Sequence, residues 1–291
     1  MPELPEVETI GRGLQAELAG RLLRDVQVRR RDLRLPIPGD FRERVVGRRI
    51  VSVQRRAKYL LLHLSSRAGS RAVAAESALA DGTLILAHLG MTGRFSVQSP
   101  PFPALGPHDH VVFFTDDDRR TTFSDPRRFG VLDLGRADRL SEHPLLKKLG
   151  PEPLDDSWDG DALLRKVAGR ASPLKALLLD QSVVAGLGNI YVSEALFRAR
   201  VSPLRPGSRL LPAEARKLAR AVKDVLKDAI AAGGSTLRDY VQADGAIGGF
   251  QTLFAVYEQQ GQRCQHRGCR GEIQRIVQAG RSTYFCPLCQ R

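Results

Sequence analysis

Residues 264–289 have the sequence CQHRGCRGEIQRIVQAGRSTYFCPLC and contain all four cysteines of the chain. Four residues separate Cys264 from Cys269, two separate Cys286 from Cys289, and 16 residues lie between the pairs. Thiolates at these spacings can reach one tetrahedral zinc ion, although four ordinary reduced cysteines are the alternative. A site of four protein sulfurs is closed, so we expect one zinc ion with a structural role.

The residues between the two pairs predict a β-hairpin. EIQRIVQ (272–278) and RSTYF (281–285) are typical of strands, and Ala279-Gly280 is suited to the turn that joins them. Five arginines surround this hairpin: Arg263, Arg267, Arg270, Arg275 and Arg281. We therefore expect the finger to present positive charge to phosphate.

The charge of the whole chain also favours a polyanionic partner. The 291 residues include 45 Lys+Arg and 32 Asp+Glu, a net charge of +13, while a hydrophobic content of 42% indicates a globular protein. No run approaches the ~18 apolar residues of a membrane span, and MPELPEVETI lacks a secretory signal pattern. We expect a cytoplasmic protein whose partner is a polyanion, most commonly nucleic acid, with no membrane partner. Disulfides are rare in that compartment.

The first half of the chain is predicted to be mostly β. After a helix expected over 5–18, eight short apolar segments follow: LLRDVQV (22–28), RIVSVQ (49–54), YLLLHL (59–64), TLILAHL (83–89), RFSVQ (94–98), HVVFFT (110–115), RTTF (120–123) and VLDL (131–134). Residues 65–82 and 99–107 interrupt this pattern and are expected to be loops.

The second half is predicted to be helical, beginning after the linker GPEPLDD (150–156). Helices are expected over 172–184, 189–199 and 212–232, the first two flanking a tight turn at Gly186-Leu187-Gly188. The third is interpreted as a core-packing helix with a solvated basic face. Residues 242–251 (QADGAIGGFQ) have no periodicity and are expected to form a mobile loop.

The N-terminus places an amine beside carboxylates. If Met1 is removed, Pro2 becomes a secondary amine, and α-amino groups titrate near 8, so a useful fraction is nucleophilic at pH 7. Its attack on an aldehyde carbon gives an iminium, and Glu3 and Glu6 are suited to moving the protons. The alternative is that proline and glutamate simply begin a helix, where the dipole favours them.

Seven strings in order along the chain resemble the bacterial formamidopyrimidine-DNA glycosylase family: PELPEVETI (2–10), QRRAKYLLL (54–62), HLGMTG (88–93), DPRRFG (125–130), GPEPL (150–154), GLGNIYVSEALF (186–197) and GRSTYFCPLCQ (280–290). The resemblance implies a bifunctional repair enzyme that excises oxidised purines, chiefly 8-oxoguanine and formamidopyrimidines, and then cleaves the abasic site by β,δ-elimination. The implied partner is double-stranded DNA with oxidised purines or abasic sites. We expect a monomer that is in the nucleoid when it is bound to DNA.

The implied fold is α+β. It combines an N-terminal β-sandwich with flanking helices over 1–150, a helix-two-turns-helix domain over 151–255, and a zinc-finger β-hairpin over 256–291.

The resemblance also implies catalytic roles. Pro2 would attack C1′ of the damaged nucleotide and form a Schiff base, while Glu3 would protonate the sugar and open its ring, with Glu6 nearby in sequence. Lys58 matches a lysine that transfers protons and contacts phosphate during β-elimination, although an exposed strand-end lysine is the alternative. Arg281 matches an arginine that promotes δ-elimination and grips the phosphates.

DNA contacts are implied at further positions. Asn189, at the start of a helix, would donate to phosphate with support from the helix dipole. The other contact positions are His88, His108, Arg127, Arg170 and Tyr257. Arg170 departs from the pattern, since the family is often lysine-rich where this chain has AGRASPLK. Residues 242–251 correspond to a flexible cover over the extruded base.

Excision requires the target base to leave the stack, at a cost of roughly a few kcal/mol. Met91, Arg127 and Phe129 match the residues that fill the resulting void. Met91 and Phe129 could instead be core residues, whereas an arginine beside Arg128 is not expected to be buried without an anion.

Two alternatives stay open. The endonuclease VIII family shares the proline nucleophile and the finger but prefers oxidised pyrimidines; Leu4, Met91 and DPRRFG favour the purine branch. A non-catalytic zinc DNA-binding protein would have the same charge and cysteines. It gives no reason for an acidic pair beside a terminal proline.

Overall fold

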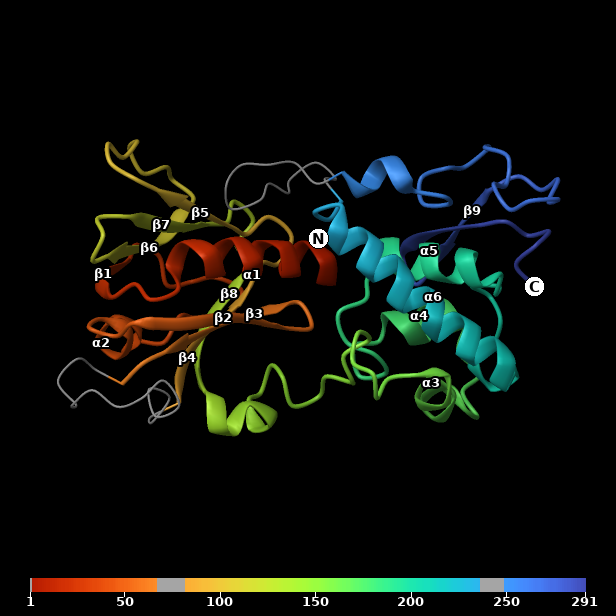
Figure 1. The fold of residues 1–291 in the computed structure, drawn as a ribbon, viewed down its shortest axis with the longest axis horizontal. Coiled ribbons are helices and arrows are strands. Elements are labelled where there is room, and N and C mark those ends of the chain that lie inside the picture. The colour runs from red at the N-terminus through yellow and green to blue at the C-terminus, as the bar shows by residue number, and fades with distance from the viewer. Residues whose placement is uncertain (1, 67–81, 236–248) are drawn as a thin grey trace. The chain divides into compact units, whose positions relative to one another are not determined.

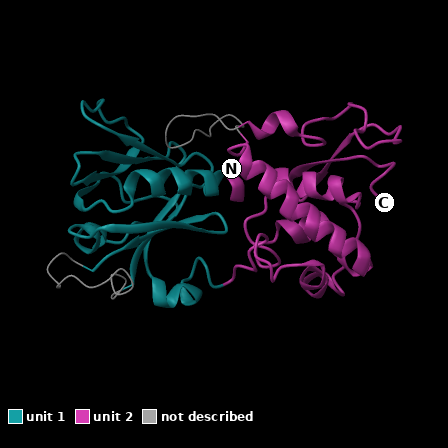
Figure 2. Cartoon of the chain, viewed as in Figure 1, with its two compact units in different colours: residues 1–2, 6–147, 236–248 teal, residues 3–5, 148–235, 249–291 magenta. Residues whose placement is uncertain are grey.

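The computed structural model describes residues 2–66, 82–235 and 249–291. They form two compact units, coloured separately in Figure 2: the first comprises Pro2 and Glu6–Lys147, and the second Glu3–Pro5, Lys148–Ser235 and Gly249–Arg291. The unit boundary at residue 148 lies just before the predicted linker at 150–156. Loops were predicted at 65–82 and 242–251, and most residues of both loops lie outside the described residues.

The first unit contains two antiparallel four-stranded sheets. One has the order β1-β6-β7-β5, with β1 (Leu23–Val28), β6 (Asp109–Thr115), β7 (Arg120–Ser124) and β5 (Arg94–Gln98). The other has the order β2-β3-β4-β8, with β2 (Ile50–Arg56), β3 (Tyr59–Leu64), β4 (Thr83–His88) and β8 (Val131–Arg136). The strand prediction is confirmed at all eight segments, because short apolar runs bounded by turn residues are typical of buried strands.

Helix α1 (Leu4–Leu18) lies against these sheets (Figure 1). Its apolar face, Val7, Ile10, Leu14 and Leu18, belongs to one buried cluster with residues of both sheets, such as Val26, Phe123, Leu60 and Ile85. The chain leaves the helix through Gly20, whose φ of +83° suits glycine at a helix C-terminus. This helix and the two sheets therefore share one core. Two short helices, α2 (Phe41–Val45) and the 3₁₀ helix η1 (Ala137–Glu142), were not expected from the sequence.

The second unit is helical. It contains α3 (Gly160–Val167), α4 (Leu174–Leu179), α5 (Asn189–Ala199), α6 (Pro212–Ala231) and the 3₁₀ helices η2 (Gly207–Arg209) and η3 (Phe250–Leu253). Helix α5 packs on α6 and α4. The prediction of α5 and α6 is confirmed, but the helix predicted over 172–184 ends at Leu179. The Asp180 carboxylate accepts hydrogen bonds from the Ser182 N–H and hydroxyl, which stabilises a turn in place of a further helical turn.

The C-terminal segment of this unit forms the predicted hairpin of β9 (Gln274–Gln278) and β10 (Arg281–Phe285). Gln278 pairs with Arg281, so the connection is two residues long, and Ala279 and Gly280 have φ values of +47° and +73°. Positive φ at both positions is typical of the type I′ turn that fits strand twist. Among the described helices, none has the length and apolar character needed to cross a membrane.

Candidate functional site

Glu3 is buried at the N-terminal end of α5. Its exposed fraction is 4%, and its carboxylate accepts hydrogen bonds from the backbone N–H of Ile190 at 3.1 Å and of Tyr191 at 3.4 Å. Helix α5 begins after Gly188, which has no side chain to accept these hydrogen bonds. The Glu3 side chain therefore caps the helix, and its charge lies at the positive end of the helix dipole.

Two glycines make this approach possible. A Cβ on Gly188 would lie 2.2 Å from the Glu3 side chain, and a Cβ on Gly186 would lie 2.7 Å from the side chain of Leu4. Gly186 also has a φ of +88°, and its carbonyl accepts a hydrogen bond from the Leu4 N–H. The side chains of Glu3 and Leu4 therefore pack directly against the Gly-Leu-Gly turn that was predicted from the sequence.

A buried lysine, not predicted from the sequence, lies in the same unit. Lys175 of α4 is 1% exposed, and its Nζ donates to the Ser282 carbonyl at 2.7 Å and to the Thr283 hydroxyl at 2.6 Å. Burial, and then the charge of Arg281, lowers the pKa of Lys175 to about 8, while Glu3 acts in the opposite direction. The amide of Asn189 also donates to the Ser282 carbonyl, at 3.0 Å.

These contacts fix the start of β10. Ser282 directly follows Arg281, whose side chain is exposed. Two donors from separate helices therefore hold the backbone that carries this arginine. The Oδ1 atom of Asn189 is buried and has no hydrogen-bond partner among the described residues.

Tyr257 lies against the same hairpin. Its ring packs edge-on against Tyr284 of β10, with centroids 5.1 Å apart. Burial raises the pKa of Tyr257, and a hydrogen bond with the Asn189 side chain opposes that shift. The position of Tyr257 is set by Glu194 of α5, whose carboxylate accepts the N–H groups of residues 255–257. Burial raises the pKa of Glu194 despite these hydrogen bonds.

The first unit contains Lys58 and His88. Lys58 lies in the two-residue turn between β2 and β3 and is only 6% exposed, so the alternative of an exposed strand-end lysine is wrong. His88 ends β4, and its Nδ1 accepts the N–H of Gly90 at 3.0 Å. Burial, with the charges of Lys58 and Arg34, lowers the pKa of His88 to about 4. His88 is therefore neutral at pH 7, with the proton on Nε2.

Met91 and Phe129 are exposed, at 38% and 42%. The alternative that they are core residues is therefore wrong. The Arg127 guanidinium lies over the Phe129 ring, 4.7 Å from its centroid. Apolar side chains at this exposure on loops of a basic protein are available to a partner.

Asp125 joins the two loops that carry these side chains. Its carboxylate, fully buried, accepts the Thr92 hydroxyl on one side and the Gly130 N–H on the other. The Thr92 hydroxyl in turn accepts the Arg127 N–H at 3.2 Å. Gly90 is required beside them, since a Cβ there would lie 2.4 Å from the Phe129 carbonyl carbon. The Met91 and Phe129 loops are thus held together by one buried carboxylate.

The four cysteines converge as predicted. Their Sγ atoms all lie within 4.8 Å of one another, with Cys264 and Cys289 3.6 Å apart and Cys269 and Cys286 3.7 Å apart. Zn–S bonds of about 2.3 Å give tetrahedral S···S edges of roughly 3.8 Å. The cluster therefore fits one zinc ion, held by four sulfurs and closed to substrate.

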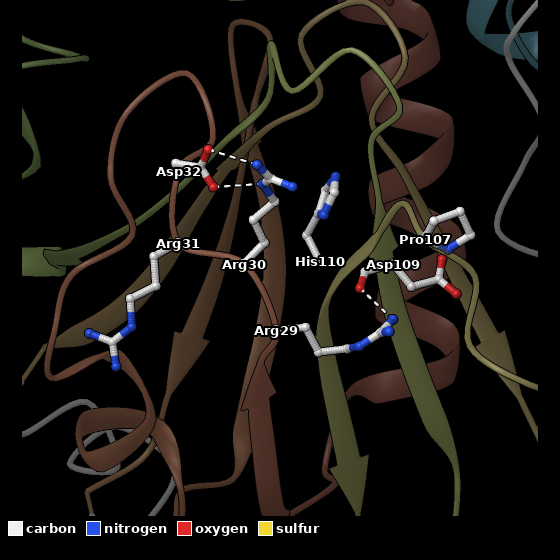
Figure 3. Close-up of a pocket in the computed structure, with 7 residues that line it drawn as sticks. All are labelled: Arg29, Arg30, Arg31, Asp32, Pro107, Asp109 and His110. Carbon is white, nitrogen blue, oxygen red and sulfur yellow. Dashed lines mark hydrogen bonds and ion pairs between the residues drawn. The ribbon is translucent and has the colours of Figure 1, made fainter.

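One pocket of the first unit is lined by arginines (Figure 3). Its volume is about 380 Å³, and its walls are Arg29, Arg30, Arg31, Asp32, Pro107, Asp109 and His110. Arg30 forms two hydrogen bonds with Asp32, and Arg29 donates to the carbonyls of Gly106 and Asp109. Two of its three cations thus already have partners within the protein.

Comparison with known proteins gives the family. The profile of the formamidopyrimidine-DNA glycosylase N-terminal domain matches residues 1–132, that of its H2TH domain residues 149–241, and that of a zinc finger found in FPG and IleRS residues 261–291. The chain is 51% identical to formamidopyrimidine-DNA glycosylase of Rhodospirillum rubrum over 296 residues, with 100% of both chains covered. The chain belongs to the formamidopyrimidine-DNA glycosylase family.

Solved structures of formamidopyrimidine-DNA glycosylases agree. The MutM (Fpg) protein of Thermus thermophilus matches with a TM-score of 0.83 and 43% identity, covering 99% of this chain and 98% of that one. A Lactococcus lactis Fpg mutant in complex with Fapy-dG containing DNA matches with a TM-score of 0.85 and 31% identity over 100% of both chains. The α+β fold expected from the sequence is thereby confirmed.

The remaining positions expected from the formamidopyrimidine-DNA glycosylase resemblance are placed as follows. Glu6 is 2% exposed in the first turn of α1, whereas His108 is exposed on the loop before β6. Arg170 is exposed in the turn after α3, and its guanidinium forms an ion pair with the Asp180 carboxylate, with an N···O distance of 3.7 Å. Pro2 is half-buried and precedes α1.

Three buried polar residues near the candidate site were not predicted from the sequence: Lys175, Glu194 and Asp125. All three are buried, and each forms a hydrogen bond with a backbone or hydroxyl group that is distant in the sequence. A charged residue inside an apolar helical pattern, as in SPLKALLL and YVSEALF, was the available signal.

Proposed function

We propose that this chain excises oxidised purines, chiefly 8-oxoguanine and formamidopyrimidines, from double-stranded DNA and then cleaves the abasic site by β,δ-elimination. Relatives at about half identity over the whole chain have the name of this activity. The observation that carries the proposal is the Glu3 carboxylate, fixed on the N-terminus of α5 directly after Pro2 in the chain.

The first step assigned to the chain is covalent. The Pro2 nitrogen, freed by removal of Met1, attacks C1′, and the bond from C1′ to the base breaks with its electron pair going to the base. The Glu3 carboxylate accepts the proton that the amine loses and returns it to the sugar ring oxygen as the ring opens. The product is an iminium between Pro2 and the open sugar. Glu6, which is 2% exposed in the first turn of α1, is assigned a part in these proton transfers.

The elimination steps are assigned to two cations. The iminium acidifies the C2′ proton, and Lys58 assists its removal and the departure of the 3′-phosphate. Arg281 grips the neighbouring phosphate and promotes the second elimination. In support, Lys175 and Asn189 both donate to the carbonyl of the residue that follows Arg281.

Base extrusion is assigned to the exposed loop residues. Met91, Phe129 and Arg127 would enter the stack where the damaged nucleotide leaves it, in the way that inserted apolar side chains separate base steps in DNA-bending proteins. His88, His108, Arg170, Asn189 and Tyr257 are proposed as DNA contacts. The zinc ion, when bound by the four cysteines, supplies rigidity to the hairpin that carries Arg281.

The domain limits inferred from the sequence, 1–150, 151–255 and 256–291, are proposed as the catalytic, helix-two-turns-helix and finger domains. We further infer a monomer located in the cytoplasm and associated with the nucleoid when bound to DNA.

A panel of duplexes tests this function. Each duplex holds one lesion, either 8-oxoguanine, a formamidopyrimidine or an oxidised pyrimidine, and base release and strand cleavage are measured separately. We expect the purine lesions to be released fastest. Faster release of oxidised pyrimidines would place the chain with endonuclease VIII in function, and tight binding without release of any base would favour a non-catalytic DNA-binding protein.

A further inference from the structure

A histidine, His266, lies beside the cysteine cluster and takes no part in the proposed reaction. The four-residue spacing between Cys264 and Cys269 leaves His266 inside the first cysteine pair. Its Nδ1 lies 3.2 Å from Sγ of Cys289 and 3.8 Å from Sγ of Cys264. The group of described side chains that converges within 4.8 Å consists of the four cysteines, so His266 lies beside the ligand set.

Two features fix the histidine there. The backbone from His266 to Cys269 forms a turn, closed by the Cys269 N–H and the His266 carbonyl at 3.0 Å, with Gly268 at a φ of +78°. A positive φ at the third residue is typical of a type II turn. The imidazole also stacks on Phe197 of α5, with ring centroids 4.1 Å apart and planes inclined by 13°.

A zinc-bound thiolate only accepts hydrogen bonds, so a nitrogen at 3.2 Å from it must carry the proton. Hydrogen bonds to the ligand atoms orient them and tune metal affinity. Phe197 is 3% exposed and packs in one cluster with Cys264, Cys286 and Ile273. The stacked ring therefore connects the metal site to the helix whose first turn holds Glu3.

We propose that His266 is a positioning residue of the zinc finger: its Nδ1–H donates to the Cys289 thiolate, and its stacking on Phe197 fixes that thiolate against α5. This role concerns metal retention and does not depend on the reaction proposed above. The proposal predicts that the Nδ1 donor and the stacked ring of His266 contribute separately to the retention of zinc.

Two substitutions separate these contributions in the full-length zinc-loaded protein. His266→Phe keeps a ring for the stack and removes the donor. His266→Asn places an amide N–H near the position of Nδ1 and removes the ring. Gln265→Ala, at the exposed neighbouring position, is the matched control.

The first readout is the rate of zinc transfer to a chromogenic chelator. We expect His266→Phe to release zinc about tenfold faster than the unmodified protein. The zinc release rate of His266→Asn is expected to be closer to that of the unmodified protein than the rate of His266→Phe is. Gln265→Ala is expected to release zinc at the rate of the unmodified protein. Equal release rates for the unmodified protein and His266→Phe would overturn the proposal.

The second readout is the spectrum of the cobalt-substituted protein, which a merely structural role would not change. Loss of a hydrogen bond to sulfur should shift the sulfur-to-cobalt charge-transfer band in His266→Phe and leave it nearly unchanged in His266→Asn. A spectrum of three sulfurs and one nitrogen in the unmodified protein would make His266 a ligand and overturn the proposal. A band unchanged in His266→Phe would also overturn it.

Discussion

The carboxylate of Glu3 accepts the backbone N–H of Ile190 at 3.1 Å, which joins two residues 187 positions apart in the chain. The same carboxylate accepts the next N–H of α5, and Gly188 supplies no side chain that would compete for these donors. The group assigned to acid chemistry is therefore also the cap of a buried helix. Its position is set by backbone atoms, which a conservative substitution leaves in place.

Glu3→Gln removes the negative charge of this side chain and keeps its size and shape. The amide keeps one acceptor for the helix but loses the charge at the positive end of the dipole, so we expect a loss of about 1 kcal/mol in the free energy of unfolding. Base release should fall sharply, while cleavage at a pre-formed abasic site is retained better. Urea unfolding and the two activity assays measure these effects, with the exposed Glu142→Gln as control. An equal fall in both activities would contradict the assigned role.

Lys175 predicts a pH dependence of stability. Its pKa is lowered from 10.5 in the unfolded chain to about 8 in the folded protein. Between these values the unfolded state binds more protons, so this residue makes stability rise with pH from about 8 to 10.5. The rise should be missing in Lys175→Met. Urea unfolding at several pH values measures both slopes, and identical slopes in the two proteins would show that the lysine titrates normally.

Met91→Ala and Phe129→Ala test the assignment of the exposed loop residues. Since both side chains are at least 38% exposed, we expect stability to change by no more than about 0.5 kcal/mol. Excision from duplex DNA should fall much more, and the deficit should shrink when the lesion lies opposite a mismatch that is already poorly stacked. The control is Leu204→Ala, which removes an apolar side chain that is 48% exposed. Undiminished excision in both loop variants would rule out a wedge.

The net charge of +13 predicts salt-dependent DNA binding. Log K should fall linearly with log salt, by about 0.9 for each phosphate neutralised. Arg281→Ala should make that slope shallower by about 0.9, the value for one phosphate contact. Arg139→Ala, at an exposed position, should leave the slope unchanged. Binding isotherms at several salt concentrations give the slopes. A flat dependence for the unmodified protein would remove the electrostatic argument.

The strands and the finger could be predicted because their signals are local. Short runs rich in Val, Ile, Leu and Phe indicate strands, and Ala279-Gly280 between two runs of strand-forming residues indicates a two-residue turn. The end of α4 was misplaced because the apolar pattern continues through Val183 and Val184, which are buried without being helical. A pattern of apolar residues indicates which residues are buried, but it does not show where a helix ends.

The buried polar residues could not be predicted because their partners are distant in sequence. Lys175 is separated from Thr283 by 108 residues, and Glu194 from Val256 by 62. The sequence shows a charge inside an apolar helical pattern at each position, but it does not show which group that charge contacts. Only the packing of the finger against α4 and α5 turns these side chains inward, where a hydrogen bond is required to offset burial.

The most direct test is the identity of the atom that becomes bonded to DNA. Borohydride added during turnover of an 8-oxoguanine duplex reduces the iminium, and peptide mapping of the trapped complex locates the bond. We expect an adduct on the Pro2 nitrogen, and we expect neither base release nor strand cleavage when Met1 is retained or an N-terminal tag is present. An adduct on Lys58, or full activity of the tagged protein, would contradict this expectation.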